Sequence, residues 1–347
     1  MIYLHIGRHK TGTSRLQYFL AQNRQRLADL GVDYPFIEDS QLAHHSVALY
    51  LLDHLAKDSE AAIKGENDMA TLQEHFDTFK GNFVISSEAF QNIQAQNSRA
   101  LVGDRETTIV CYFREQASYV LSSYSQSIIG ANNYGSFLDH AKRFYTDVNY
   151  YRDASSWTNI YGVDAVRLRA FDRKQLVNED ICYDFLHVLD LTDSAADFDH
   201  TIKAYGDSVY GDLLKMKMAL NKSGYDAPTY QSRVVYWLRE LARENPEYSS
   251  QPQLSKEFVD QFRGFYQEQN AALFGEFEIE NATQFRLQDL TQKHSESPLD
   301  DEVCIDHSFD YHQIPHARRI LDDLYVKDAE VAKLFEQALL VNNIQVD

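Results

Sequence analysis

The sequence predicts an α/β protein, in which an open, mostly parallel sheet is flanked by helices and followed by a mainly helical C-terminal part. Three observations predict this class. Short apolar, β-branched runs alternate with segments of helical periodicity through the first half of the chain. A glycine-containing loop joins the first such run to the first helical segment, as at the start of a parallel α/β sheet. Beyond about residue 175 the helical periodicity continues and the strand signals fade.

Four segments are predicted to be strands. Residues 2–6 alternate in hydropathy, and residues 83–86 follow a turn. Residues 108–113 form a nearly continuous apolar run, which suits a strand buried on both faces of a parallel sheet. A fourth strand is expected near 164–168. Helical patterns separate the strands at about 43–56, 68–80, 116–129 and 136–144. This alternation predicts parallel strands joined by right-handed helical crossovers.

The length of 347 residues suits two domains or one large α/β body. We expect residues 1–190 to form the α/β core and residues 191–347 to form a mainly helical part packed on it. Helical periodicity recurs in that second part near 205–221, 230–244, 255–273 and 327–341. No stretch rich in glycine, proline or serine separates the two parts, which favours one continuous body.

The composition excludes several classes of protein. Hydrophobic residues make up 44% of the chain and aromatic residues 13%, which is too many for a disordered protein. The net charge of −19 disfavours binding to nucleic acid or to anionic membranes. No apolar run approaches the length of a membrane span, and the first strand begins too early for a secretory signal. Three widely spaced cysteines, Cys111, Cys182 and Cys304, form no disulfide framework. We therefore expect a cytoplasmic protein.

Positive charge is concentrated at the N-terminus of this acidic chain. Residues 1–30 contain five arginine or lysine side chains but a single carboxylate, Asp29. Such an island indicates either a local anion-binding site or a solvated basic helix face. Charge alone does not distinguish the two.

The loop after the first strand has the spacing of a phosphate-binding loop. Gly7 and Gly12 stand five residues apart, as in a P-loop, and the helical pattern begins at Thr13. A nucleotide-hydrolysing P-loop continues with Lys and Ser or Thr, whereas here the lysine lies inside the loop at Lys10. The strand at 108–113 is followed by Arg114 rather than by a magnesium-binding aspartate. The sequence thus predicts a P-loop-type phosphate site that is not built for ATP hydrolysis.

Two motifs together resemble those of sulfotransferases that use 3′-phosphoadenosine 5′-phosphosulfate (PAPS). Residues 10–14, Lys-Thr-Gly-Thr-Ser, match the family's 5′-phosphosulfate loop at every position. Arg114 at a strand end and Ser122 eight residues later match its 3′-phosphate motif. The likeness is greatest to bacterial members, whose first motif reads H-I-G-x-x-K-T-G-T-[ST]-x-L-Q and whose second reads R-x₇-S-x-Y-x-Q. It covers about residues 1–190.

The resemblance implies a transferase with PAPS as co-substrate and no requirement for a metal. It implies in-line transfer of the sulfuryl group to an acceptor hydroxyl, with Lys10 neutralising the leaving oxygen. The residues implied to hold the 5′-phosphosulfate are Arg8, His9, Lys10, Thr11, Gly12, Thr13 and Ser14. Arg114 and Ser122 are implied to hold the 3′-phosphate. Where other members carry an adenine-stacking tryptophan, this chain has Arg15, so the adenine contact stays unassigned.

The acceptor hydroxyl needs a general base, and three residues are candidates. Glu88 follows the strand at 83–86, where ligands bind in open α/β sheets. In the family the base is a histidine in some branches and a glutamate in others, and His44 and His45 are the rivals here. Glu88 could instead form a helix cap or an ion pair, and one histidine could simply pack.

By analogy with the bacterial relatives, the expected acceptor is a carbohydrate hydroxyl, on a polysaccharide or a glycolipid. Two other functions stay open: a nucleotide or small-molecule kinase that uses the same loop, and a non-catalytic nucleotide-binding protein. Two weaker signals also have two interpretations. Tyrosines between residues 119 and 151 suit sugar binding or core packing. The histidines and Cys304 between residues 294 and 316 have no defensible metal-site spacing, so a solvated polar loop is favoured there.

Overall fold

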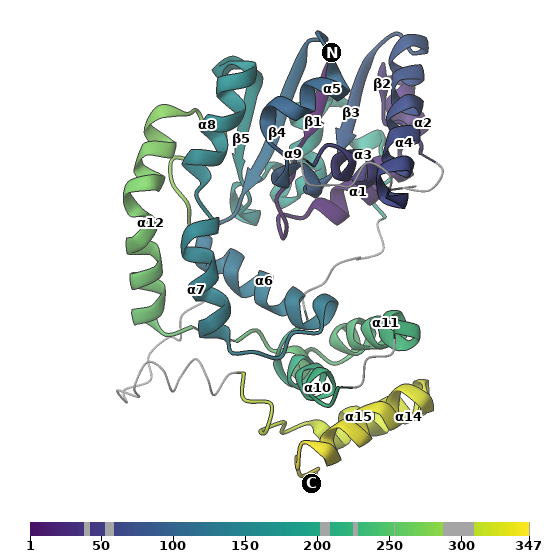
Figure 1. The fold of residues 1–347 in the computed structure, drawn as a ribbon, viewed down its shortest axis with the longest axis vertical. Helices are drawn as coiled ribbons and strands as arrows, with labels where there is room; N and C mark the ends of the chain where they lie inside the picture. The colour runs from purple at the N-terminus through teal and green to yellow at the C-terminus, as the bar shows by residue number, and fades with distance from the viewer. Residues whose placement is uncertain are drawn as a thin grey trace. The chain divides into compact units, whose positions relative to one another are not determined.

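The computed structural model describes residues 1–37, 42–52, 59–201, 209–224, 228–252, 254–286 and 309–346. The chain forms two compact units (Figure 1). The first unit comprises Met1–Glu115, Asn149–Gly206 and Tyr266–Arg286, and the second comprises Gln116–Val148, Asp207–Phe265 and Leu287–Asp347. Each unit therefore draws on three separate stretches of sequence. The domain boundary that the sequence suggests near residue 190 stays a prediction.

The first unit is built on a parallel sheet. Within the described residues this sheet has five strands in the order β2-β3-β1-β4-β5, and every neighbouring pair is parallel. The strands are β1 (Ile2–His5), β2 (Val32–Asp33), β3 (Asn82–Ser86), β4 (Thr107–Phe113) and β5 (Val166–Ala170). The open parallel sheet confirms the predicted fold class. The sequence missed β2, because two residues are too few to show alternation.

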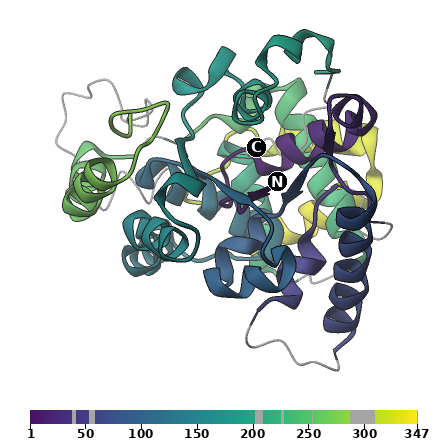
Figure 2. The same cartoon turned by 90° about the horizontal axis from the view of Figure 1, so that it is seen from above.

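Helices lie on both sides of this sheet (Figure 2). One face is buried by α1 and α9, whose Leu16, Phe19 and Phe185 pack with Tyr3 and Tyr112 in a single apolar cluster. Helix α8 contacts β4 and β5. The α-helices of the first unit are α1 (Thr13–Gln22), α2 (Arg24–Asp29), α3 (His45–Tyr50), α4 (Glu60–Thr78), α5 (Arg99–Val102), α8 (Tyr150–Tyr161) and α9 (Ile181–Val188), with the end of α12 (Lys256–Glu276).

The register of the sheet brings the carboxyl ends of its strands to one edge. His5 at the end of β1 lies between Ser86 of β3 and Val110 of β4, and Phe113 pairs with Ala170 at the end of β5. The segments that follow these strands start at residues 6, 87, 114 and 171. In open parallel sheets, ligands bind at this edge. The fold therefore collects the first motif, Glu88 and Arg114 at one end of the sheet.

The second unit is built of helices. They are α6 (Gln116–Ala131), α7 (Phe137–Asp147), α10 (Gly211–Lys222), α11 (Pro228–Glu244), α14 (Ala317–Lys327) and α15 (Ala329–Val341), with the start of α12 (Lys256–Glu276). Helix α10 packs on α6 and α15 and buries Leu213, Met216 and Met218. The helical character expected for the C-terminal part is present here, and α6 and α7 from the middle of the chain join it.

Candidate functional site

The loop after β1 has a backbone that requires its two glycines. Gly7 and Gly12 have φ values of 55° and 75°, in the left-handed region that favours glycine. A Cβ atom on Gly7 would lie 2.8 Å from the Cα atom of Glu88. A Cβ atom on Gly12 would lie 2.8 Å from the ring of Phe171. The two glycines therefore let the loop approach the segments that follow β3 and β5.

Hydrogen bonds within the loop fix its curvature. The hydroxyl groups of Thr11 and Thr13 both donate to the carbonyl oxygen of Arg8, over 2.7 Å and 3.1 Å. Helix α1 begins directly after Gly12, and among the described residues no side chain caps this end. Its first turn reads Thr-Ser-Arg-Leu and contains no carboxylate. The amide groups at such a helix start favour an anion.

The residues of the first motif divide by exposure. The side chains of Thr11 and Thr13 are buried beneath the loop, where they hold its backbone. His9 and Ser14 are exposed, and Lys10 is half-buried. Lys10 itself has a φ of 65°, which is uncommon for a residue with a side chain. The side chains suited to contact a ligand are therefore those of exposed His9 and Ser14, together with that of half-buried Lys10.

Arg114 joins the second motif to the first. Its guanidinium donates a hydrogen bond to the carbonyl oxygen of Lys10 over 3.1 Å and lies 6.0 Å from the ring centroid of Phe171. The sequence-predicted partner Ser122 is buried in α6, which belongs to the second unit. The pairing of Arg114 with Ser122 stays a prediction.

Arg8 is engaged inside the protein. Only 9% of its side chain is exposed, and its guanidinium forms an ion pair with Asp153 on α8. The same guanidinium lies 4.8 Å from the ring centroid of Tyr150. Burial raises the pKa of Asp153 above its usual range, and the positive charge of Arg8 opposes that rise.

Glu88 and His45 lie side by side after β3. His45 Nε2 is 3.8 Å from Glu88 Oε2, and the amide group of Gln17 donates to the same carboxylate oxygen over 3.1 Å. His45 Nδ1 is 2.7 Å from the hydroxyl oxygen of Ser87, which also accepts a hydrogen bond from the amide of Ala89. Ser87 can donate its proton to Nδ1, and in that tautomer Nε2, the nitrogen nearer to Glu88, carries the ring proton. Both side chains are partly exposed, His45 by 41% and Glu88 by 21%.

His44 occupies a different position from its neighbour. Its Nδ1 accepts a hydrogen bond from the amide of Ser86 over 3.1 Å, and its Nε2 lies 3.2 Å from the carbonyl oxygen of Pro35. Burial lowers the pKa of His44 to about 4, so its ring is neutral at pH 7. Both ring nitrogens of His44 are therefore engaged in contacts with the backbone.

Several contacts of this region were not expected from the sequence. Gln17 ends the first motif, and that position was the available signal for its contact with Glu88. Tyr150 and Asp153 lie on α8 in a segment without a motif. Arg15 forms an ion pair of 2.5 Å with Asp180, so it is held beside α9. A search restricted to conspicuous motifs could not find these partners.

The histidine-containing segment between residues 294 and 316 lies partly outside the described residues. His294, Cys304 and His307 lie outside the described residues. His316 lies 2.7 Å from a carboxylate oxygen of Asp212, in the second unit. Over the ranges that the structure describes, no group of three or more histidine, cysteine, aspartate or glutamate side chains is arranged to hold a metal ion. Over the same ranges, no helix combines the length and apolar character needed to span a membrane.

Comparisons with known proteins give distant similarities. No model of a known protein family matches the chain. A protein of Archaeoglobus fulgidus, described as uncharacterized, is 28% identical over 202 residues, which cover 56% of this chain and 53% of that relative. The chain thus spans about half the length of this curated relative. Among solved structures, the crystal structure of a sulfotransferase from Alicyclobacillus acidocaldarius is similar with a TM-score of 0.40 and 16% identity, over 70% of this chain and 95% of that one.

Proposed function

We propose that this protein is a sulfotransferase that moves the sulfuryl group of PAPS to an acceptor hydroxyl. The observation that carries the proposal is the hydrogen bond from the Arg114 guanidinium to the Lys10 carbonyl oxygen, over 3.1 Å. It places the cation of the second motif against the loop of the first. PAPS carries a phosphate group at each end of its ribose, so its site needs two anion-binding places close together. An arginine fork and a helix N-terminus are each suited to one of them.

In the proposed reaction the acceptor oxygen attacks sulfur in line with the bond that breaks. The bond between sulfur and the bridging oxygen of the phosphosulfate is cleaved, and adenosine 3′,5′-bisphosphate (PAP) leaves. Negative charge grows on that bridging oxygen, where the Lys10 ammonium and the amides at the start of α1 would stabilise it. These groups supply the positive charge that a metal ion would supply in a kinase, so the proposal requires no metal. His9, Thr11, Gly12, Thr13 and Ser14 would form the rest of the loop.

The proposed base is Glu88, supported by His45. The acceptor proton passes to a carboxylate oxygen of Glu88, and the His45 ring beside it stabilises and orients that carboxylate. The reverse assignment, with His45 as base and Glu88 as its partner, uses the same pair. His44 is the weakest of the three candidates, because its two ring nitrogens already hold Ser86 and Pro35. The proposed acceptor is a carbohydrate hydroxyl, and this part rests on the likeness to bacterial family members.

Calorimetric titration with PAP, ADP and ATP, each with and without magnesium, tests the proposal. We expect PAP to bind independently of magnesium and at least about tenfold more tightly than ADP. Only PAP carries a 3′-phosphate, to which Arg114 can donate one or two charge-assisted hydrogen bonds. Arg114→Met should remove most of that preference, while Arg26→Met on α2 should leave it intact. ATP binding that exceeds PAP binding and needs magnesium would favour a kinase. Tight PAP binding without transfer to any acceptor would favour a nucleotide-binding protein.

A further inference from the structure

One helix outside both motifs contacts both of them. Tyr150 and Asp153 are three residues apart on α8 and so share one face of it. Asp153 forms the ion pair with Arg8 of the loop. The hydroxyl of Tyr150 donates to the carbonyl oxygen of Arg114 over 2.6 Å. The same helix face thus contacts Arg8 in the loop of the first motif and Arg114, which directly follows β4.

These contacts continue into the groups that would touch a nucleotide. The carbonyl oxygen of Arg8 accepts the hydrogen bonds of Thr11 and Thr13, so its place sets the curvature of the loop. The ring of Tyr150 stacks on Phe113 with centroids 4.5 Å apart and is 1% exposed, so it is fixed in place. Because the Tyr150 hydroxyl binds the Arg114 carbonyl oxygen, it also fixes the backbone position from which the Arg114 side chain extends.

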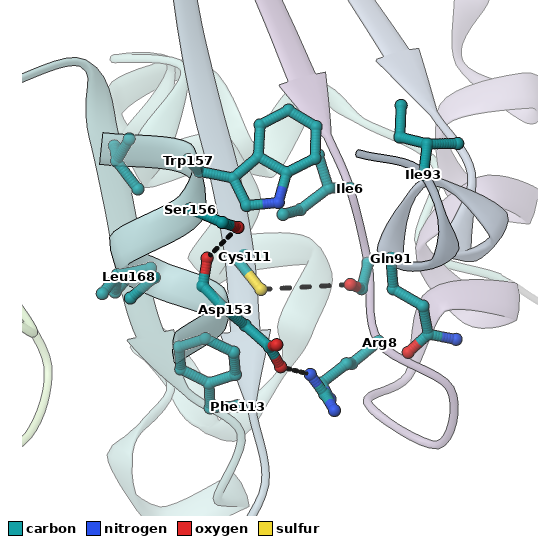
Figure 3. A pocket seen from close by; sticks show the side chains of 13 residues that line it. Ile6, Arg8, Gln91, Ile93, Cys111, Phe113, Asp153, Ser156, Trp157 and Leu168 are labelled. Atoms are coloured by element: carbon teal, nitrogen blue, oxygen red, sulfur yellow. Dashed lines mark hydrogen bonds and ion pairs between the residues drawn. The ribbon is translucent and has the colours of Figure 1, made fainter. Parts of the chain in front are cut away.

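The loop after β1 borders a cavity on the side of α8. The cavity has a volume of about 100 Å³, with Arg8 and Asp153 on its wall. Figure 3 shows their side chains reaching toward one another beside it. The remaining lining is mainly apolar and includes Ile6, Cys111, Phe113, Trp157 and Leu168. At this cavity the Arg8 guanidinium is held by the directional ion pair with Asp153 and lies against the ring of Tyr150, so a change at Asp153 should disturb its position.

We propose that Asp153 and Tyr150 are positioning residues: Asp153 sets the 5′-phosphosulfate loop through Arg8, and Tyr150 sets the 3′-phosphate ligand through Arg114. This inference rests on the proposed function. It assigns Arg8 a role behind the loop rather than direct contact with the phosphosulfate. Replacing Asp153 with asparagine should then weaken binding of the 5′-phosphate end of the nucleotide and leave binding of the 3′-phosphate end unchanged.

Calorimetric titration with PAP, adenosine 5′-monophosphate and adenosine 3′-monophosphate tests this division. We expect Asp153→Asn to weaken binding of PAP and of the 5′-monophosphate by about tenfold, the low end of what outer partners of a bound group contribute. Binding of the 3′-monophosphate should change by less than about twofold, within the usual error of additive effects. Tyr150→Phe should show the opposite pattern, with a loss of roughly fivefold for the 3′-monophosphate, the worth of one hydrogen bond.

Conservative and double variants separate positioning from general damage. Arg8→Lys keeps the charge and should retain most PAP binding, whereas Arg8→Met should lose as much as Asp153→Asn. The double variant with Arg8→Met and Asp153→Asn should be no weaker than either single one, because both remove the same pair. Arg26→Met and Asp197→Asn are matched controls, since these residues form an ion pair of 2.5 Å elsewhere in the first unit. Circular dichroism melting reports whether each variant is folded. If Asp153→Asn does not fold, the comparison of Arg8→Lys with Arg8→Met still tests the role of the ion pair.

The outcomes distinguish this inference from the proposed function. If the wild-type chain binds PAP but Asp153→Asn binds it equally well, the inference is overturned and the function stands. Tighter PAP binding by Asp153→Asn would also overturn it, because a released Arg8 would then be a phosphate ligand itself. A wild-type chain that binds none of the three nucleotides would overturn the proposed function and this inference with it.

Discussion

His45 Nε2 lies 3.8 Å from Glu88 Oε2, so the two strongest candidates for the catalytic base form one neighbouring pair. Each is anchored by a further contact, Glu88 by the Gln17 amide and His45 by the Ser87 hydroxyl. A carboxylate beside an imidazole can hold that ring in one tautomer or be oriented by it. Experiments on one member of the pair should therefore include the other.

Glu88→Gln should lower turnover by about 10²- to 10⁴-fold, the range that a positioned general base contributes. PAP affinity should change little, because Gln retains the size and hydrogen-bonding capacity of the side chain. Turnover is measured as PAP release in the presence of an acceptor, and affinity by calorimetry. The matched variant is His45→Gln. Full activity of Glu88→Gln together with an inactive His45→Gln would reverse the assignment within the pair.

Lys10→Ala should reduce turnover by about 10²- to 10³-fold, the cost of removing one preorganised stabilising group. The loss should exceed the loss of PAP affinity, because the charge on the bridging oxygen is largest in the transition state. Lys80→Ala, at an exposed site before β3, is the control for loss of one positive charge. Equal losses in turnover and affinity would mean that Lys10 only binds nucleotide.

The first unit should lose stability in mild acid through two buried histidines. Burial lowers the pKa of both His5 and His44 to about 4, below the value of about 6.5 in an unfolded chain. The unfolded state therefore binds more protons between these values, so stability is complete above about pH 6.5 and falls as the pH drops toward 4. The loss amounts to about 3 kcal/mol for each histidine. Below pH 4 neither contributes further loss.

Guanidinium unfolding at a series of pH values measures this loss. His44→Gln should flatten part of the acid slope, because an amide keeps hydrogen-bonding capacity without titrating. His312→Gln, at an exposed site of the second unit, is the control. An unchanged slope for His44→Gln would assign the acid loss to other groups.

Asp184→Asn should destabilise the first unit by about 3–5 kcal/mol, because it leaves a buried guanidinium without its charge partner. Arg169 and Asp184 form a two-point ion pair, with distances of 2.5 Å and 2.8 Å, and neither side chain is more than 2% exposed. The Tyr112 hydroxyl donates to the same carboxylate over 2.8 Å. Denaturant unfolding measures the effect, and Asp197→Asn in an exposed pair is the control. A loss below about 1 kcal/mol would show that Glu280, the second partner of Arg169, suffices.

The sheet was predictable because its signals are local. Continuous apolar runs identify β4, and the glycine loop identifies the turn from β1 to α1. The observed register of these parallel strands then brings the loop, Glu88 and Arg114 to one edge of the sheet.

The partners on α8 were not predictable. Asp153 and Arg8 are separated by 145 positions, and an aspartate on a helix has no pattern that reveals its partner. Tyr150 belonged to a group of tyrosines that suited either sugar binding or packing, and its burial supports packing. His44 and His45 were equivalent in sequence. They differ in the structure because the His44 ring is buried, whereas the His45 ring is partly exposed.

The left-handed backbone at Lys10 has a consequence for how this loop could evolve. A residue with a side chain pays about 1 kcal/mol for such a conformation, and glycine does not. Replacing Lys10 with glycine should therefore raise the melting temperature of the protein while removing the ammonium that the proposed reaction depends on. Selection for thermal stability would therefore favour glycine at position 10, whereas selection for turnover would favour lysine.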